Sequence, residues 1–444
     1  MRRRDLLAGA GVILASGGAV AAGVAVLTGE QAHRRMLDQL GIKGLRPGVD
    51  GLNPNAANPV NYDEARAGPF SLLPDPLALP DGTPVRDPKT WWTVRRPQIV
   101  ETFAREIHGR VPRGLPAPVW RTVKTEHVTR GGVAVVERRL AGDVVAHGRT
   151  VTIDLLVGAP EGTAKVPCVV ELGFPDGPPW LRGRPPPPPG GIAPDWRDAA
   201  IARGWAYGIY APTSVQPDDP GKLQEGIIGL ANRGRPRSPD DWGALRAWAW
   251  GVSRVVDLFE ADPAIDAGRV AAAGMSRYGK AALLAMAYEP RLAAGYIASS
   301  GEGGAKLHRR RRGEQVENLA AVGEHHWMAG NFLRYAGPLT ADDLPVDAHS
   351  LMALAAPRPL FIGAGADATD GWVDARGMFM AAAAASPVWR LLGGQGLDRQ
   401  VFPPPLTLTQ GDDLVFRQHA EGHTPGPNWP YFMDVAERAF RRAA

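Results

Sequence analysis

Apolar and polar positions along the chain follow two different periods, and their order predicts the order of its secondary structure. Residues 133–140 and 150–157 alternate apolar with polar side chains as the strands of a hairpin do, and 166–172 is a short apolar run. Further strands are predicted at 205–210, 269–273, 294–299 and 358–362. Helical spacing or helix-forming composition predicts helices at 91–108, 241–259, 280–288 and 429–442. Strands that alternate with helices predict a doubly wound, mostly parallel sheet of the α/β class.

The same patterns divide the chain into parts. Residues 29–90 are rich in Asn, Pro and Gly and show little periodicity, which predicts an extended arm packed on the surface of the main domain. Residues 91–444 carry the predicted strands and helices as one domain, and 301–345 form a long insertion between two of its strands. With 444 residues, 44% of them hydrophobic, the chain can bury a large core.

The first 28 residues have the layout of an export signal of the twin-arginine type. Arg2, Arg3 and Arg4 precede an apolar run rich in Ala, Gly and Val that ends at Leu27. We therefore expect a periplasmic or secreted protein, exported already folded. The run is also long enough to remain as a membrane anchor, which is the alternative outcome.

Charge and cysteine content exclude several classes of protein. The formal net charge is only +4, so no general basic surface is available and a nucleic-acid partner is not expected. The run Arg309-Arg-Arg-Arg312 is predicted to be a solvated loop, one that could also attract an acidic polysaccharide. Cys168, the single cysteine, lies in an apolar run and is predicted to be buried without a disulfide. His325 and His326 lack the spacing of a zinc helix, and no metal or cofactor is expected.

Candidate chemistry centres on Ser276, which lies between a short apolar run and a predicted helix. Gly274 and Gly279 flank this serine, as in the sharp strand–turn–helix that exposes a nucleophile at the carboxyl edge of a sheet. The common G-x-S-x-G pattern would need glycine at 278, where this chain has Tyr278, so the motif alone is weak. Carboxylates after the strand at 358–362 and His419 and His423 further on complete the order serine, acid, histidine.

These segments together resemble the glucuronoyl esterases, carbohydrate esterase family 15, in their bacterial form. The resemblance runs from about residue 61 to the end of the chain. It is carried by the elbow and by Asn61-Tyr-Asp-Glu64, Ser238-Pro-Asp-Asp-Trp-Gly-Ala244, Ser300-Gly-Glu-Gly-Gly304, Arg312-Gly-Glu314, His326-Trp327, Leu344-Pro-Val-Asp-Ala-His349, Ala356-Pro-Arg-Pro359 and Gly422-His423.

The resemblance implies an α/β-hydrolase fold and a serine esterase. Its substrate would be the ester between a 4-O-methyl-glucuronate of glucuronoxylan and a lignin alcohol, and the protein is expected to be a monomer. The implied catalytic groups are Ser276 as nucleophile, His423 as general base and acid, and Arg277 beside the oxyanion. Positions that hold the uronate hydroxyls in the family correspond to Lys280, Glu314 and Trp327.

The acid of the triad departs from the family pattern. Many members carry a glutamate at the position of Ser299, so the carboxylate must come from elsewhere. Asp370 is the first candidate because it follows the strand after which α/β-hydrolases usually place the acid. Glu302 is the rival, and Asp374 comes third.

Two other functions remain open from the sequence. The chain could be an esterase for other esters, such as acetylated xylan or small aryl esters. It could also be a carbohydrate-binding homologue that has lost the chemistry, since the family's glutamate is missing at 299.

Overall fold

The computed structural model describes residues 25–68, 71–177, 195–397, 401–409, 411 and 413–443. Residues 1–24, most of the predicted export signal, lie outside the described residues. The centre of the described chain is one nine-stranded sheet in the order β1-β2-β3-β5-β4-β6-β7-β8-β9. The strands are β1 Val119–Arg130, β2 Val133–Ala146, β3 Arg149–Pro160, β4 Val166–Leu172, β5 Ala206–Tyr210, β6 Ile265–Met275, β7 Leu292–Ala298, β8 Leu360–Ala364 and β9 Leu414–Gln418.

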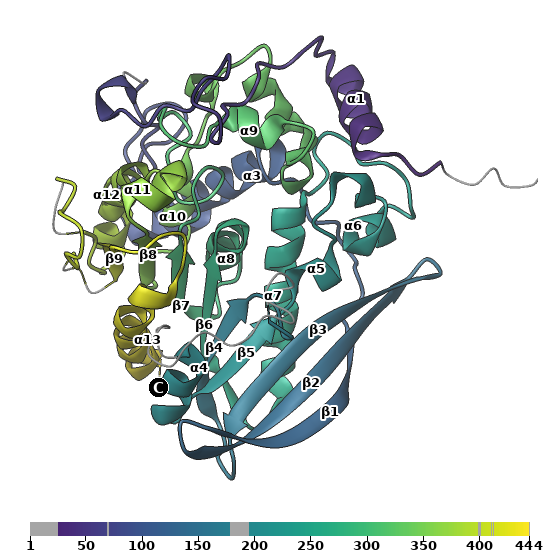
Figure 1. Cartoon of the computed structure of the whole chain (residues 1–444), viewed down its shortest axis with the longest axis vertical. Helices are drawn as coiled ribbons and strands as arrows, with labels where there is room; N and C mark the ends of the chain where they lie inside the picture. The colour runs from purple at the N-terminus through teal and green to yellow at the C-terminus, as the bar shows by residue number, and fades with distance from the viewer. Residues whose placement is uncertain are drawn as a thin grey trace, which may run out of the picture.

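The sheet has an antiparallel part and a parallel part. Strands β1, β2, β3 and β5 pair antiparallel in that order, and every pair from β5 through β4 to β9 is parallel. Figure 1 shows β1–β3 as a long twisted ribbon beside the compact parallel part. The predicted mostly parallel sheet is confirmed, while β1 and β9 were not predicted.

Helices cover both faces of the parallel part. They are α1 Gly29–Leu40, α2 Pro88–Thr90, α3 Arg96–Glu106, α4 Trp196–Ala202, α5 Pro212–Val215, α6 Gly226–Ala231, α7 Ala244–Ala261, α8 Arg277–Tyr288, α9 Val316–Ala320, α10 Ala348–Ala353, α11 Asp367–Asp370, α12 Ala375–Leu391 and α13 Trp429–Ala443. Helices α4 and α13 lie on one face, whereas α7, α8 and α12 lie on the other (Figure 1). Short turns of helix connect them: η1 Glu64–Arg66, η2 Trp91–Arg95, η4 Pro220–Lys222, η5 His325–Trp327, η6 Gly330–Ala336, η7 Ala341–Asp343, η8 Gly371–Val373 and η9 Gly426–Asn428.

The central strands are buried from both sides. In β6, Val270 and Ala272 belong to the core under α7 and α8, and Ala271 and Ala273 belong to the core under α13. A strand between two helical layers reads as a continuous apolar run because neither face meets water. Cys168 of β4 is fully buried, as predicted.

The N-terminal arm is not extended throughout. Its first part is helix α1, which starts with a capping box between Thr28 and Gln31. His33, Met36 and Leu37 are buried on one side of this helix, at the spacing of an amphipathic surface helix. The prediction of an extended segment is wrong for 29–40, because the capping box and the buried face of three residues stabilise a helix before the Asn- and Pro-rich stretch begins.

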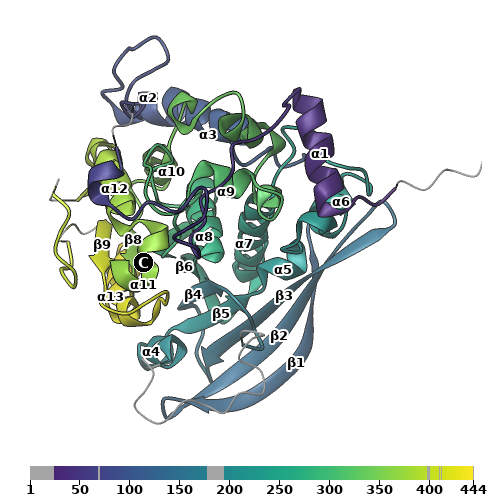
Figure 2. The same cartoon turned by 45° about the horizontal axis from the view of Figure 1, so that its top comes forward.

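The insertion between β7 and β8 folds as short helices joined by turns. It holds α9, η5, η6 and η7, and α10 follows it. Helix α10 contacts both α3 and α8, the helix that follows Ser276 (Figure 2). The arm is fixed to the insertion by Arg46, whose guanidinium donates to the carbonyl oxygens of Tyr335, Gly337 and Leu339.

Candidate active site

Ser276 occupies a strained turn between β6 and α8. Its φ and ψ angles are 57° and −128°, a conformation that side chains rarely adopt, and its backbone N–H donates to the carbonyl of Ala298 in β7 at 2.9 Å. A Cβ added at Gly274 would lie 2.3 Å from the carbonyl oxygen of Tyr278, and one at Gly279 would lie 2.8 Å from that of Ala298. The glycine after the serine is therefore needed at 279, where α8 approaches β7. This explains the displaced motif.

His423 and Asp370 form a hydrogen-bonded pair next to this serine. Nδ1 of His423 lies 2.7 Å from Oδ1 of Asp370, and Asp370 is 4% exposed. Oδ2 of Asp370 accepts hydrogen bonds from the Ser299 hydroxyl at 2.6 Å and from the Gly365 N–H at 2.7 Å. Ser276 and His423 line the same cavity, which has a volume of about 620 Å³. The structure thus brings a serine, a histidine and a carboxylate to one place.

The two other candidate acids lie elsewhere. Glu302 is fully buried and binds the Lys306 ammonium at 2.6 Å and the His308 ring. Burial raises the pKa of Glu302, but these two cations outweigh it and hold the pKa below its usual value. Asp374 is held by Arg310 and Arg312. Neither carboxylate contacts His423 within the part of the chain that the structure describes.

Arg277, the residue after the nucleophile, is held at the rim of the cavity by Asp218. Its Nη1 lies 2.5 Å from Oδ2 of Asp218, and its guanidinium lies over the Trp327 ring, 5.4 Å from the centroid. The second carboxylate oxygen of Asp218 accepts from His326 Nε2 at 2.9 Å and from Trp327 Nε1 at 2.7 Å. Burial opposes ionisation, yet these donors lower the pKa of Asp218 to about 2. Asp218 was missed from the sequence, although a carboxylate in the loop after β5 was a usable signal.

Lys280 and Glu314 form a buried ion pair one helical turn after Ser276. Lys280 Nζ lies 2.9 Å from Glu314 Oε2, and the two side chains are 5% and 6% exposed. The ammonium also lies 5.5 Å from the centroid of the Trp327 ring. The three residues assigned by resemblance to the sugar are therefore neighbours in space. The indole N–H of Trp327, however, is already bound to Asp218.

Four comparisons with known proteins agree with this geometry. A family model for the glucuronyl esterases of fungi matches residues 237–393. The carbohydrate esterase MZ0003 of an unknown prokaryotic organism is 31% identical over 403 residues, 85% of this chain and 91% of that protein. A 4-O-methyl-glucuronoyl methylesterase of Schizophyllum commune is 32% identical over 340 residues, which cover 73% and 74% of the two chains. The solved structure of a family 15 glucuronoyl esterase from Teredinibacter turnerae is 40% identical, with a TM-score of 0.85 and coverage of 93% and 99%.

The chain belongs to the glucuronoyl esterases of carbohydrate esterase family 15. It is accordingly a carboxylic ester hydrolase with the α/β-hydrolase fold, which confirms the predicted family, fold and enzyme class.

Two carboxylates of this glucuronoyl esterase that sequence reasoning missed lie near the site. Glu171, at the end of β4, lines the cavity and accepts from Trp196 Nε1 at 2.9 Å, and burial raises its pKa to about 7. Glu324 precedes His325, and burial together with the charge of Glu314 raises its pKa to about 7 as well. No described residue donates to the buried Oε2 of Glu324. Each residue sits in a segment whose local pattern carries no chemical signal.

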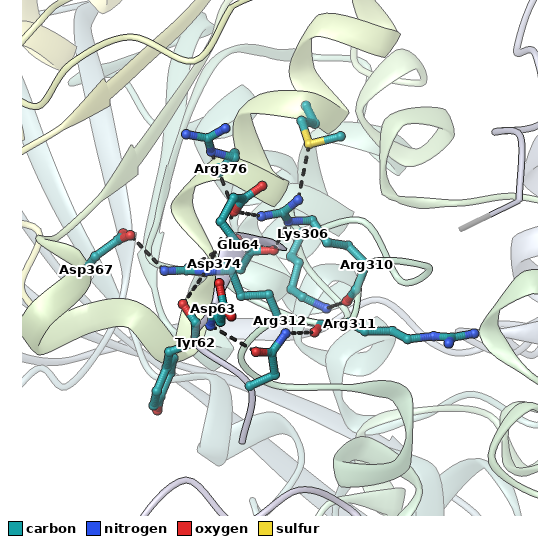
Figure 3. A network of polar contacts seen from close by, with 12 residues as sticks. Tyr62, Asp63, Glu64, Lys306, Arg310, Arg311, Arg312, Asp367, Asp374 and Arg376 are labelled. Atoms are coloured by element: carbon teal, nitrogen blue, oxygen red, sulfur yellow. Dashed lines mark hydrogen bonds and ion pairs between the residues drawn. The ribbon is translucent and has the colours of Figure 1, made fainter. Parts of the chain in front are cut away.

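The arginine run is not a solvated loop, so that prediction is wrong. Arg309, Arg310 and Arg312 are 3%, 3% and 6% exposed, and only Arg311 faces solvent. Figure 3 shows Arg310 and Arg312 among carboxylates from distant parts of the chain, those of Glu64, Asp367 and Asp374. The sequence around the run cannot reveal such distant partners. Because three of the four arginines are buried in ion pairs, the run is not a surface for an acidic polysaccharide.

Across the described segments, no group of three or more His, Cys, Asp or Glu side chains is arranged to hold a metal ion. None of the helices in those segments is both long enough and apolar enough to cross a membrane.

Proposed function

We propose that this enzyme hydrolyses the ester between the (4-O-methyl-)glucuronate of glucuronoxylan and a lignin alcohol, through an acyl-enzyme on Ser276. The observation that carries the proposal is the pairing of His423 with Asp370 at 2.7 Å beside the cavity that holds Ser276. The curated relatives named 4-O-methyl-glucuronoyl methylesterase support the uronate as the acyl part.

Acylation begins when His423 removes the proton from the Ser276 hydroxyl and the serine oxygen bonds to the uronate carbonyl carbon. The carbonyl π electrons move to oxygen and form a tetrahedral oxyanion. When this intermediate collapses, the bond to the alcohol oxygen breaks and His423 gives that oxygen its proton. Asp370 keeps the imidazole in the tautomer that accepts from serine and stabilises the imidazolium.

Deacylation repeats these steps with water. His423 takes a proton from water, the hydroxide oxygen bonds to the acyl carbon, and the bond to the Ser276 oxygen breaks. The serine oxygen recovers its proton from His423, and glucuronic acid leaves. No redox step or further reactant is involved.

Arg277 is proposed to stabilise the oxyanion in both halves. In nucleophile elbows the backbone N–H of the residue after the serine is one oxyanion donor, and here that residue also brings a guanidinium. Its ion pair with Asp218 keeps the group at the mouth of the cavity while the site is free.

Lys280, Glu314 and Trp327 are proposed to recognise the sugar. An ammonium donates and a carboxylate accepts, so this pair can satisfy both roles of a sugar hydroxyl. The buried pair is also a preorganised one, because neither group can turn to bulk water.

The alcohol would lie against the apolar part of the same cavity. That surface is built by Leu172, Phe174, Met275, Tyr278 and Pro425. Aromatic and aliphatic side chains of this kind favour an aromatic alcohol over a small polar one.

Export and oligomeric state are part of the proposal. The twin-arginine pattern at residues 1–28 supports export to the periplasm or beyond, with retention as an anchor as the alternative. We expect the exported enzyme to act as a monomer.

The test compares benzyl glucuronate with 4-nitrophenyl acetate for the full-length chain and for Ser276→Ala and Asp370→Asn. A strong preference for the glucuronate that is lost in Ser276→Ala and greatly reduced in Asp370→Asn is the expected result. Hydrolysis of the acetate alone would indicate a general esterase. Binding of the glucuronate without turnover would indicate a carbohydrate-binding homologue.

A further inference from the structure

A cluster of charges, with Arg310, Arg312 and Asp374 buried at its centre, connects the N-terminal arm to the loop that carries Asp370. We name this cluster, consisting of Glu64, Arg310, Arg312, Asp367 and Asp374, the arginine clamp (Figure 3). The five residues come from three segments that are far apart in the sequence.

Arg312 spans both ends of the acid loop. Its Nη2 lies 2.8 Å from Asp367 Oδ2, three residues before Asp370, and its Nη1 lies 3.4 Å from Asp374 Oδ1, four residues after Asp370. Its Nε donates to the carbonyl oxygen of Tyr62 in the arm at 3.3 Å. One planar guanidinium therefore fixes the distance between the two ends of the loop.

Arg310 is the second guanidinium that binds Asp374, and it connects this carboxylate to the arm. Its Nε lies 2.6 Å from Asp374 Oδ2, and its Nη2 binds the Glu64 carboxylate. Asp374 is fully buried and has a φ of 52°, in the left-handed region that side chains seldom occupy. A buried carboxylate in this conformation needs both guanidinium partners to stay in place.

Backbone contacts extend the connection to the sugar side of the cavity. Gly313 N–H donates to the carbonyl of Asn61 at 3.0 Å, and Glu314 N–H donates to that of Trp372 at 2.9 Å. The segment that carries the arginines thus lies between the arm and the acid loop, and it ends at the glutamate that pairs with Lys280.

We propose that the arginine clamp positions Asp370 for its contact with His423, and that Glu64 makes the N-terminal arm part of this positioning device. The inference rests on the assignment of Asp370 to the triad made above. None of the clamp residues touches the reacting atoms, so they are positioning residues and not catalytic ones.

The geometry explains why such a device matters. The loop 367–374 consists of two short helical turns, α11 and η8, and ends at Asp374, the C-cap of η8. A carboxylate that moves away from its histidine no longer stabilises the imidazolium, and displacements of about 1 Å can cost about a hundredfold in rate.

The test uses charge-conserving variants of the full-length chain. Arg312→Lys keeps the cation but loses the fork that reaches Asp367, Asp374 and Tyr62 together. Arg311→Lys is the matched control, because the Arg311 side chain is 61% exposed and, among the residues that the structure describes, forms an ion pair only with Asp342, at 3.4 Å. Glu64→Asp withdraws the carboxylate from Arg310 without changing charge, and the exposed Glu30→Asp in α1 is its control.

We expect Arg312→Lys and Glu64→Asp to lower kcat on benzyl glucuronate by about tenfold to a hundredfold with little change in KM. Titration of the active sites with a serine-directed phosphonate gives the concentration of active enzyme, so that kcat is expressed per active site. The two controls should keep the wild-type kcat and KM. A role in folding alone would lower the thermal midpoint and the amount of active enzyme but leave kcat per active site unchanged.

The outcomes distinguish failure of the clamp from failure of the triad assignment. A wild-type kcat per active site in Arg312→Lys and Glu64→Asp, with Asp370→Asn strongly impaired, would overturn the clamp and leave the triad intact. Full activity of Asp370→Asn would instead overturn the triad assignment. If Arg312→Lys fails to fold, Glu64→Asp decides alone, since Glu64 is 44% exposed and tolerates a shorter side chain.

Discussion

The Ser299 hydroxyl donates a 2.6 Å hydrogen bond to the same Asp370 carboxylate whose other oxygen holds His423. The resemblance to the family implies a glutamate at this position in many members. In this chain Ser299 donates to the carboxylate of the Asp370–His423 pair and does not itself supply a carboxylate. This contact supports Asp370, on the loop after β8, as the acid of the proposed triad.

Ser299→Ala should weaken catalysis without abolishing it. Asp370 would keep the Gly365 N–H and lose one of the two donors to Oδ2. A hydrogen bond to a charged group contributes about 1.5–3 kcal/mol, so we expect kcat to fall by about tenfold. Steady-state kinetics beside Ser300→Ala, whose hydroxyl accepts from the Ala305 N–H instead, would check the specificity of the effect. Wild-type kcat in Ser299→Ala would show that the hydroxyl is dispensable.

Asp218→Asn should weaken the stabilisation of the oxyanion by Arg277. The amide oxygen can still accept from His326 and Trp327, but Arg277 loses its charged partner and its fixed place. Removing an oxyanion donor outright costs about a hundredfold or more, so loosening one should cost about tenfold in kcat. Asp219→Asn is the neighbouring control. Equal rates in both variants would mean that Arg277 needs no anchor.

Lys280→Met should lower both the activity on the uronate ester and the stability of the fold. The enzyme should lose about tenfold or more in kcat/KM for benzyl glucuronate and much less for 4-nitrophenyl acetate. The Glu314 carboxylate would be left buried without its cation, which costs about 3–5 kcal/mol of the free energy of unfolding. Adding Glu314→Gln should recover stability but not discrimination. An equal loss on both esters would contradict the sugar role.

Glu171 should make stability depend on pH in a defined window. Burial raises its folded-state pKa to about 7, from about 4.3 for an ordinary glutamate. The contribution of Glu171 to the free energy of unfolding is complete below its unfolded-state pKa and is lost as the pH rises through its folded-state pKa of about 7. Between these values the free energy of unfolding should fall by up to about 1.4 kcal/mol per pH unit because of this group.

Glu171→Gln keeps an acceptor for the Trp196 indole and removes the titration. Urea unfolding at pH 5, 6 and 7 should show a flatter pH dependence in the variant than in the wild type. Glu324, whose pKa is raised in the same direction, is unchanged in both chains and cancels in the comparison. Parallel slopes would contradict the assignment to Glu171.

The elbow and the mostly parallel class of the sheet could be predicted because both depend on local sequence patterns. The run 270–273 is apolar on both faces, and Gly274 and Gly279 lie where a Cβ would meet backbone oxygens. His423 was also accessible, since it follows the acid in the order that the fold requires.

The charged residues were predicted less well, because their partners are distant in sequence. Arg310 reads as solvated until Glu64 and Asp374 are brought to it by folding. Strand β1 was missed for another reason: most of its residues are exposed, so its apolar positions do not alternate with polar ones as those of a half-buried strand do.

Cys168 lies inside β4, shielded from solvent, and is the only sulfhydryl in the sequence. A single cysteine cannot form a disulfide within these 444 residues, so their folding needs neither an oxidant nor a disulfide isomerase. The thermal midpoint should therefore be the same with and without a reductant.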